Sequence, residues 1–186
     1  MERYRILFSG SGGQGVITAS IFLAEAAVLY EGLNAVQSQA YGPEARGGAT
    51  RADVIISDGA IRFPKVNQPN ILVSLTQEAY NKFSGDIRPG GLLLVDSHFA
   101  SIERKVDARQ VALKMYQTIM DQIGNPIVLN TCMLGALIGL TNVIKTESIL
   151  KVLETRLPPD FLDMNKKAFE IGLDLAEKYL EEPSVM

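Results

Sequence analysis

A glycine-rich loop between an apolar strand and a helix-patterned segment is the feature that most limits the folds open to this chain. The run YRILF precedes the loop SGSGGQG at residues 9–15, and apolar residues then recur at helical spacing from residue 16 to residue 30. Gly32 follows at a position where helices commonly end. A strand, a glycine turn and a helix in this order predict the first unit of an open α/β sheet, whose ligands bind at the carboxyl ends of the strands.

The rest of the chain continues this alternation and then becomes helical. Strands are predicted at 3–8, 34–38, 51–57, 70–75 and 88–97, with a short return strand over AIRFP at 60–64 and a helix that starts at Thr76. Helices are predicted at 107–124, 130–140, 146–157 and 158–180. We therefore predict a single domain over residues 1–186, of the Rossmann-like α/β class. Its sheet is open and mostly parallel, with helices on both faces and a helical C-terminal part.

Composition excludes several classes of protein. The formal net charge of −3 offers no basic field for nucleic acid. The single cysteine, Cys132, excludes a disulfide framework and an intrachain cysteine cluster for a metal. The longest apolar run, at 132–140, is about half of what spans a bilayer, and the N-terminus has no secretory pattern. We expect a cytoplasmic protein that binds no nucleic acid and no membrane.

The glycine-rich loop fits G-x-G-x-x-G at Gly10, Gly12 and Gly15. A dinucleotide site also needs an acidic residue about 20 residues on, but the end of the second predicted strand carries QSQ at 37–39. No lysine follows the last glycine, so a Walker phosphate loop is excluded. Two interpretations stay open: the loop binds a phosphate-bearing ligand at the helix N-terminus, or its glycines permit close packing of helix on sheet.

A second candidate is the polar loop QSQAYGPEARGG at 37–48, which follows a strand at the same edge of the predicted sheet. Arg46 is suited to a phosphate or carboxylate, and Gly47 and Gly48 to a close approach by another chain. The alternative is a solvated loop with a Glu44–Arg46 surface pair. His98 is the only histidine, and no catalytic triad or metal-ligand spacing accompanies it. A self-sufficient catalyst is hard to assemble from these residues, which favours a subunit of a larger enzyme.

Three segments together resemble one family. SGSGGQGV near the N-terminus, QAYGPEARGGATRADVIIS about 25 residues later and NTCMLGAL near position 130 are similar to the gamma subunit of 2-oxoacid:ferredoxin oxidoreductases. The likeness extends over nearly the whole chain and is greatest for the 2-oxoglutarate type. The pyruvate, branched-chain 2-oxoacid and indolepyruvate types remain alternatives.

The resemblance implies a reaction in which a 2-oxoacid, coenzyme A and oxidised ferredoxin give an acyl-CoA, carbon dioxide and reduced ferredoxin. It implies alpha and beta partner subunits, with a ferredoxin-like delta subunit as a further partner. Thiamine diphosphate, magnesium and iron–sulfur clusters are then expected on the partners, and this chain is expected to supply no catalytic residue and no metal ligand. A free-standing Rossmann-like nucleotide-binding protein is the alternative, and a hydride-transfer enzyme is disfavoured by the missing acid.

The resemblance also implies that the two loops face the partner subunits and contact coenzyme A. The residues expected to make this contact are Ser9, Gly10, Ser11, Gly12, Gly13, Gln14, Gly15, Gln39, Tyr41, Arg46, Gly47 and Gly48.

Overall fold

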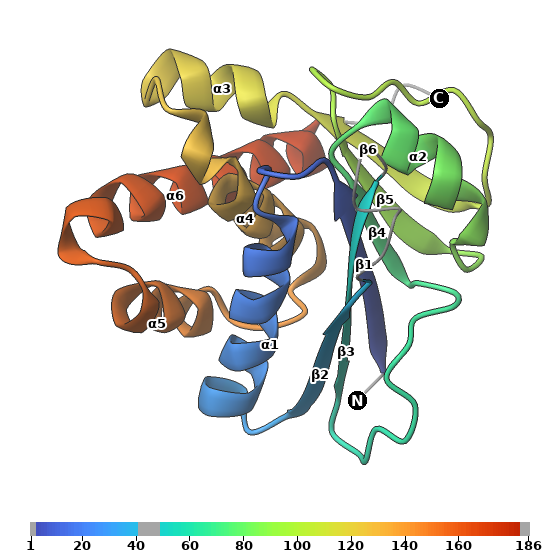
Figure 1. Cartoon of the computed structure of the whole chain (residues 1–186). Coiled ribbons are helices and arrows are strands. Elements are labelled where there is room, and N and C mark those ends of the chain that lie inside the picture. The colour runs from blue at the N-terminus through green and yellow to red at the C-terminus, as the bar shows by residue number, and fades with distance from the viewer. Residues whose placement is uncertain (1–2, 41–48, 183–186) are drawn as a thin grey trace.

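A six-stranded sheet with the order β2-β3-β1-β4-β5-β6 forms the centre of the computed structural model, which describes residues 3–40 and 49–182 (Figure 1). The strands are β1 (Tyr4–Gly10), β2 (Asn34–Gln39), β3 (Thr50–Ser57), β4 (Ile71–Ser74), β5 (Gly91–Asp96) and β6 (Ala108–Leu113). The predicted open sheet is confirmed, and β1 lies at the point where the strand order reverses.

Three of the strand pairings, β1–β4, β4–β5 and β5–β6, are parallel, whereas β3 runs antiparallel to both β1 and β2. Parallel neighbours need a crossover of a dozen or more residues. The connection between β2 and β3 is shorter than that, so β3 returns beside β2 in the opposite direction. The prediction of a mostly parallel sheet holds, with this one strand reversed.

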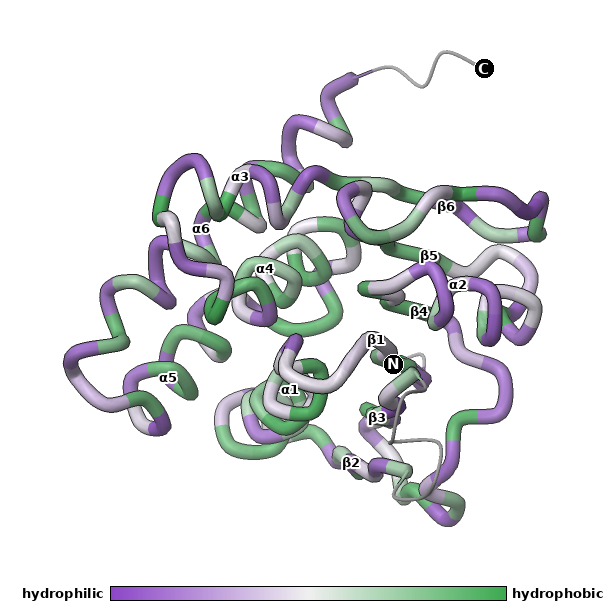
Figure 2. Tube along the Cα trace, turned by 45° about the horizontal axis from the view of Figure 1, so that its top comes forward, coloured by the Kyte–Doolittle hydropathy of each residue, from purple (hydrophilic) through white to green (hydrophobic). Residues whose placement is uncertain are grey.

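The helices cover the two faces of the sheet unequally, as Figures 1 and 2 show. One face carries α1 (Val16–Glu31), α3 (Met115–Gln122), α4 (Leu129–Thr141), α5 (Thr146–Arg156) and α6 (Pro159–Glu181), with the 3-10 turn η3 (Pro126–Val128). The other face carries α2 (Gln77–Phe83) and the turn η2 (Ser84–Asp86). The predicted Thr76 cap of α2 is confirmed, because its hydroxyl accepts a hydrogen bond from the Ala79 amide.

Helix α4 is the buried helix of the larger layer, and it lies directly against α6. Gly135 of α4 and Gly172 of α6 make this approach possible. A Cβ on Gly172 would lie 2.6 Å from the Ala136 amide nitrogen, and one on Gly135 would overlap the Phe169 carbonyl. Across the same contact, the buried Thr131 hydroxyl donates to Asn165 at 2.6 Å.

Two sequence predictions are wrong. The segment 107–124, predicted as one helix, divides into β6 and α3, because residues 108–113 pair in parallel with the free edge of β5. Val111 and Leu113 are buried while Ala112 between them is exposed, which is the alternation of a strand. The predicted return strand at 60–64 has no regular structure, and it ends at Pro64, which has no amide proton to give to a ladder.

Candidate functional site

The glycine-rich loop and residues 37–40, the described start of the second predicted loop, lie at the same edge of the sheet, where β1, β2, β4, β5 and β6 end. Gly10, the last residue of β1, faces Thr50, and Gln39, the last residue of β2, faces Ala52. The reversed strand β3 therefore begins at the edge where its neighbours end. This arrangement brings the glycine-rich loop beside the start and the end of the 40–49 connection.

The Gln14 side chain ties the glycine-rich loop to the end of β4, the strand paired with β1. Its Oε1 accepts a hydrogen bond from the Ser11 amide at 2.8 Å, and its Nε2 donates to the Leu75 carbonyl at 3.0 Å. Gly10 leaves room for this amide, since a Cβ there would lie 2.5 Å from Gln14 Oε1. Gln14 thus fixes the shape of the loop at the point where the strand order reverses.

The tip of the loop is open. Gly12 and Gly13 are exposed, and a Cβ on either would meet no described atom within 4 Å. Gly13 and Gly15 have positive φ angles of 88° and 72°. Gly15 is the N-cap residue of α1, and this N-terminus has no side-chain capping hydrogen bond and no acidic residue in its first turn. Such an N-terminus has free N–H groups and a partial positive charge, and is suited to an anion.

Not all predicted contact residues are equally available to a ligand. The Ser9 side chain is fully buried, and its hydroxyl donates to the Thr50 carbonyl at 2.8 Å, so it ties β1 to β3. Gln39 is partly exposed and accepts a hydrogen bond from Gln37 at 3.3 Å. The predicted residues Tyr41, Arg46, Gly47 and Gly48 lie outside the described residues.

Two hollows flank the edge. One, of about 300 Å³, lies beside the loop and is lined by Gly13, Gln14, Phe99, Tyr116, Asn125, Pro126, Ile127 and Leu129. The other, of about 620 Å³, adjoins the end of β2 and is lined by Ser38, Gln39, Ala40, Arg51, Asp53, Pro64, Lys65 and Asn67. Within the second hollow, Arg51 and Asp53 form an ion pair of 2.9 Å.

The wall of the first hollow contains aromatic residues that sequence reasoning missed. Tyr116 stacks on His98 with ring centroids 4.4 Å apart, and Phe99 meets Tyr116 edge-on at 4.9 Å. His98 and Phe99 follow β5, whereas Tyr116 begins the helix after β6. Because 107–124 reads as a continuous helix in the sequence, nothing there indicates that Tyr116 returns to the end of β5.

Asp96 positions this aromatic group. Its buried carboxylate accepts hydrogen bonds from the His98 amide at 2.8 Å and the Tyr116 amide at 2.7 Å. Burial raises the pKa of Asp96 against these two hydrogen bonds, which lower it. Burial, together with the nearby Asp96 charge, also raises the pKa of the Cys132 thiol to about 12. Asp96 therefore caps two segments, and Cys132 stays a protonated thiol in the core.

The acid that a dinucleotide site requires is not found near the loop in the described residues. Glu31, the last residue of α1, accepts hydrogen bonds from the Lys145 amide at 2.9 Å and from Ser148, and it caps α5. Burial opposes these bonds, but they lower the pKa of Glu31 overall. Within residues 3–40 and 49–182, no three His, Cys, Asp or Glu side chains gather to hold a metal ion. No helix in that same part of the chain has both the length and the hydropathy for crossing a bilayer.

Comparison with known proteins decides the family. The family model described as pyruvate ferredoxin/flavodoxin oxidoreductase matches residues 5–175. The chain belongs to this family. A 2-oxoglutarate synthase subunit KorC from Methanocaldococcus jannaschii is 44% identical over 178 residues, which are 95% of this chain and 95% of that subunit.

Solved structures agree with the fold. The gamma subunit of a keto/oxoacid ferredoxin oxidoreductase from Geobacter sulfurreducens is 43% identical, with a TM-score of 0.85 over 94% of this chain and 99% of that one. A 2-oxoglutarate:ferredoxin oxidoreductase from Magnetococcus marinus, solved with 2-oxoglutarate, coenzyme A and succinyl-CoA bound, has a TM-score of 0.84 at 24% identity. That match covers 96% of this chain and 32% of that one, and shows a shared fold. The resemblance to the gamma subunit is confirmed.

Proposed function

We propose that this chain is the gamma subunit of a 2-oxoglutarate:ferredoxin oxidoreductase. The observation that carries the proposal is the 44% identity to a 2-oxoglutarate synthase subunit over 95% of both chains. The enzyme converts 2-oxoglutarate and coenzyme A to succinyl-CoA and carbon dioxide, and passes two electrons to ferredoxin. Alpha and beta subunits, with a ferredoxin-like delta subunit, are the partners.

The electron-transfer and decarboxylation chemistry belongs to the partner subunits in this proposal. A four-iron cluster takes four cysteine thiolates, and this chain contains one cysteine, which is buried. Thiamine diphosphate and magnesium are assigned to the partners by the family resemblance. What this chain contributes is a shaped edge: the glycine-rich loop, the uncapped start of α1 and the aromatic hollow beside them.

Coenzyme A is the ligand proposed for that edge. Gly12 and Gly13 expose their backbone, and the N-terminus of α1 supplies free amides to a pyrophosphate group. Gln14 keeps these groups in one arrangement before the ligand arrives, which lowers the entropy lost on binding. In this proposal a partner subunit closes over the bound ligand at the glycine-rich loop.

Co-purification tests the subunit assignment. The tagged chain, isolated from its native source, is expected to bring down two or three partners. The complex is expected to reduce a viologen dye with coenzyme A and 2-oxoglutarate, and more slowly with pyruvate, a branched-chain 2-oxoacid or indolepyruvate. A chain that purifies without partners and binds NAD by itself would refute the proposal and favour a free-standing nucleotide-binding protein.

A substitution at the loop tip tests the coenzyme A contact. Gly12→Leu adds a side chain where the described structure is open, so folding is retained while the approach of a ligand is blocked. The KM for coenzyme A is expected to rise at least tenfold, with the KM for 2-oxoglutarate unchanged. Gly59→Leu is the matched control, because Gly59 is also exposed, an added Cβ there would meet only Ser57 Oγ at 3.9 Å, and it follows β3 at the opposite edge. Equal KM values in both variants would contradict the contact.

A further inference from the structure

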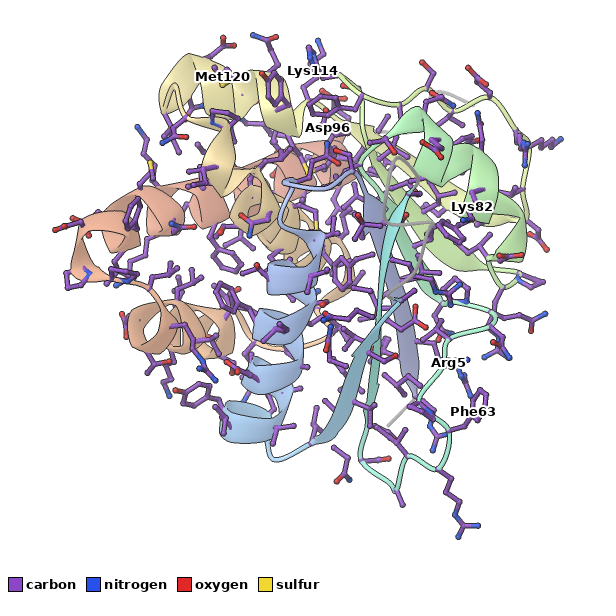
Figure 3. The ribbon with its side chains drawn as sticks, in the orientation of Figure 1. Arg5, Phe63, Lys82, Asp96, Lys114 and Met120 are labelled. Carbon is purple, nitrogen blue, oxygen red and sulfur yellow. The ribbon has the colours of Figure 1, made fainter. Side chains whose placement is uncertain are left out.

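A third concave site lies at the opposite edge of the sheet, where the parallel strands begin, and it shares Lys65 and Asn67 with the hollow beside β2. This amino-edge pocket has a volume of about 650 Å³. Figure 3 labels Arg5 and Phe63 at this edge, far from Asp96 at the carboxyl edge. The lining residues are Arg5, Phe63, Lys65, Asn67, Gln68, Gly85, Asp86, Ile87 and Arg88.

The pocket concentrates positive charge in a chain whose net charge is −3. Arg5, Lys65 and Arg88 line it together, and Asp86 is the one carboxylate among the lining residues. The ion pairs found within the described residues involve none of these four side chains. Burial lowers the pKa of Arg5, and the positive charges of Arg88 and Arg3 lower it further.

The backbone around the pocket is firmly held. The Arg5 amide donates to the Asn70 side chain at 2.9 Å, and the Arg88 amide donates to the Pro69 carbonyl at 3.0 Å. A turn closed by the Gly91 amide on the Arg88 carbonyl, at 2.9 Å, precedes β5. The two arginines are therefore carried by ordered positions on neighbouring parts of the sheet, which is how a pre-formed anion site is built.

We propose that the amino-edge pocket binds the phosphate groups of a small anionic ligand. One guanidinium group can donate two parallel hydrogen bonds to the oxygens of a phosphate, and the ammonium group of a lysine adds a positive point charge. The Asn67 and Gln68 amides offer further donors, and a volume of about 650 Å³ is within the range of small-molecule sites. Phe63, which is 58% exposed, gives the pocket an apolar surface on which a ring of the ligand can rest.

Calorimetric titration of the full chain with pyrophosphate and with ADP, at 150 mM salt, tests this site. We expect saturable binding of both probes. The double variant Arg5→Gln/Arg88→Gln is expected to weaken it at least tenfold, and Arg62→Gln, a neighbouring exposed cation outside the lining, is expected to leave it unchanged. If ADP binds more tightly than pyrophosphate, and Phe63→Ala removes this difference, the ligand is a nucleotide. If ADP and pyrophosphate bind equally tightly, the ligand is an inorganic phosphate.

The glycine-rich loop is the competing site, so its variant is measured in parallel. Gly12→Leu is expected to leave pyrophosphate binding at the amino edge intact. Amide chemical shifts of the unmutated chain give a readout that does not depend on the folding of any variant. On addition of pyrophosphate, the amide chemical shifts of Gly85, Asp86 and Arg88 are expected to change.

Four results would overturn the proposal. The first is that neither probe binds saturably, and the second is that Arg62→Gln weakens binding as much as the double variant does. The third is that the amide chemical shifts change only at Gly12 and Gly13. The fourth is that binding disappears in the assembled complex because a subunit covers the pocket. The coenzyme A proposal is judged separately, by the KM of the Gly12→Leu complex.

Discussion

Replacing the glycines of the loop one at a time by alanine separates two physical effects that the structure assigns to different positions. Gly12 has open space and no positive φ, Gly13 has open space with φ of 88°, and Gly15 has φ of 72° and a close neighbour. At Gly15 an added Cβ would lie 2.7 Å from Nδ2 and 2.9 Å from Cβ of Asn130. The three positions therefore form a graded series within one loop.

The expected free energies follow from these differences. Gly12→Ala leaves the free energy of unfolding unchanged or raises it by up to about 1 kcal/mol, since alanine restricts the unfolded chain. Gly13→Ala lowers it by about 1–2 kcal/mol, the cost of a left-handed backbone for alanine. Gly15→Ala has the same backbone cost and a further cost of about 1–3 kcal/mol for overpacking against Asn130. It therefore lowers the free energy of unfolding by about 2–5 kcal/mol in total.

Thermal unfolding followed by circular dichroism measures the series. For a chain of this length about 1 kcal/mol shifts the midpoint by about 2–4 °C, so Gly13→Ala should lower it by about 2–8 °C and Gly15→Ala by about 4–20 °C. Equal midpoints for Gly12→Ala and Gly13→Ala would refute the left-handed backbone at Gly13. Equal midpoints for Gly13→Ala and Gly15→Ala would refute the contact with Asn130.

Four further outcomes are expected. Gln14→Ala, which removes the hydrogen bond to Ser11 within the loop and the one to Leu75 after β4, should lower the free energy of unfolding in urea by about 1–3 kcal/mol; an unchanged midpoint would argue against this role of Gln14. Because the pKa of Asp96 is raised above its ordinary 3.8, its contribution to stability is full below pH 3.8 and is lost as the pH rises through the folded value. The stability of the native chain relative to Asp96→Asn should therefore fall with rising pH in urea titrations, and a constant difference would contradict this. Cys132, with a pKa of about 12, should resist a thiol reagent at pH 8 until the chain is unfolded, and rapid labelling of the native chain would contradict its burial. Gly172→Ala should lower the thermal midpoint although alanine favours helices, whereas Gly85→Ala, in open space, should not.

Local patterns in the sequence predict those strands and helices whose own residues show a strand or helix periodicity. The β1–loop–α1 unit is predicted because an apolar run, a glycine cluster and a helical repeat follow one another within 30 residues. The strand β6 is missed because ARQVAL contains residues common in helices, and its strand conformation depends on the free edge of β5. The direction of β3 likewise depends on a partner, since pairing is decided between strands.

In the candidate site, too, some features can be predicted from the sequence and others depend on how the strands pair. The glycine-rich loop and its place at the carboxyl edge follow from the sequence, because the loop comes directly after a strand. The aromatic hollow does not, since Tyr116 reaches His98 only through the pairing of β6 with β5 and the two hydrogen bonds to Asp96. The pocket at the amino edge is missed for the same reason: Arg5 of β1 and Arg88, which precedes β5, line one pocket because β1 and β5 both pair with β4.

The helical C-terminal part contacts the glycine-rich loop through α4. Asn130, in the first turn of α4, lies directly against Gly15 and donates to its carbonyl at 3.5 Å. The next residue, Thr131, is tied to Asn165 of α6 by a buried hydrogen bond, and the Gly135–Gly172 approach holds the two helices at one separation. These contacts follow one another along α4 and connect α6, through Asn130, to the start of α1. The loop is therefore held by two sets of contacts: those of Gln14 with Ser11 and Leu75, and that of Gly15 with Asn130, a residue more than a hundred positions away.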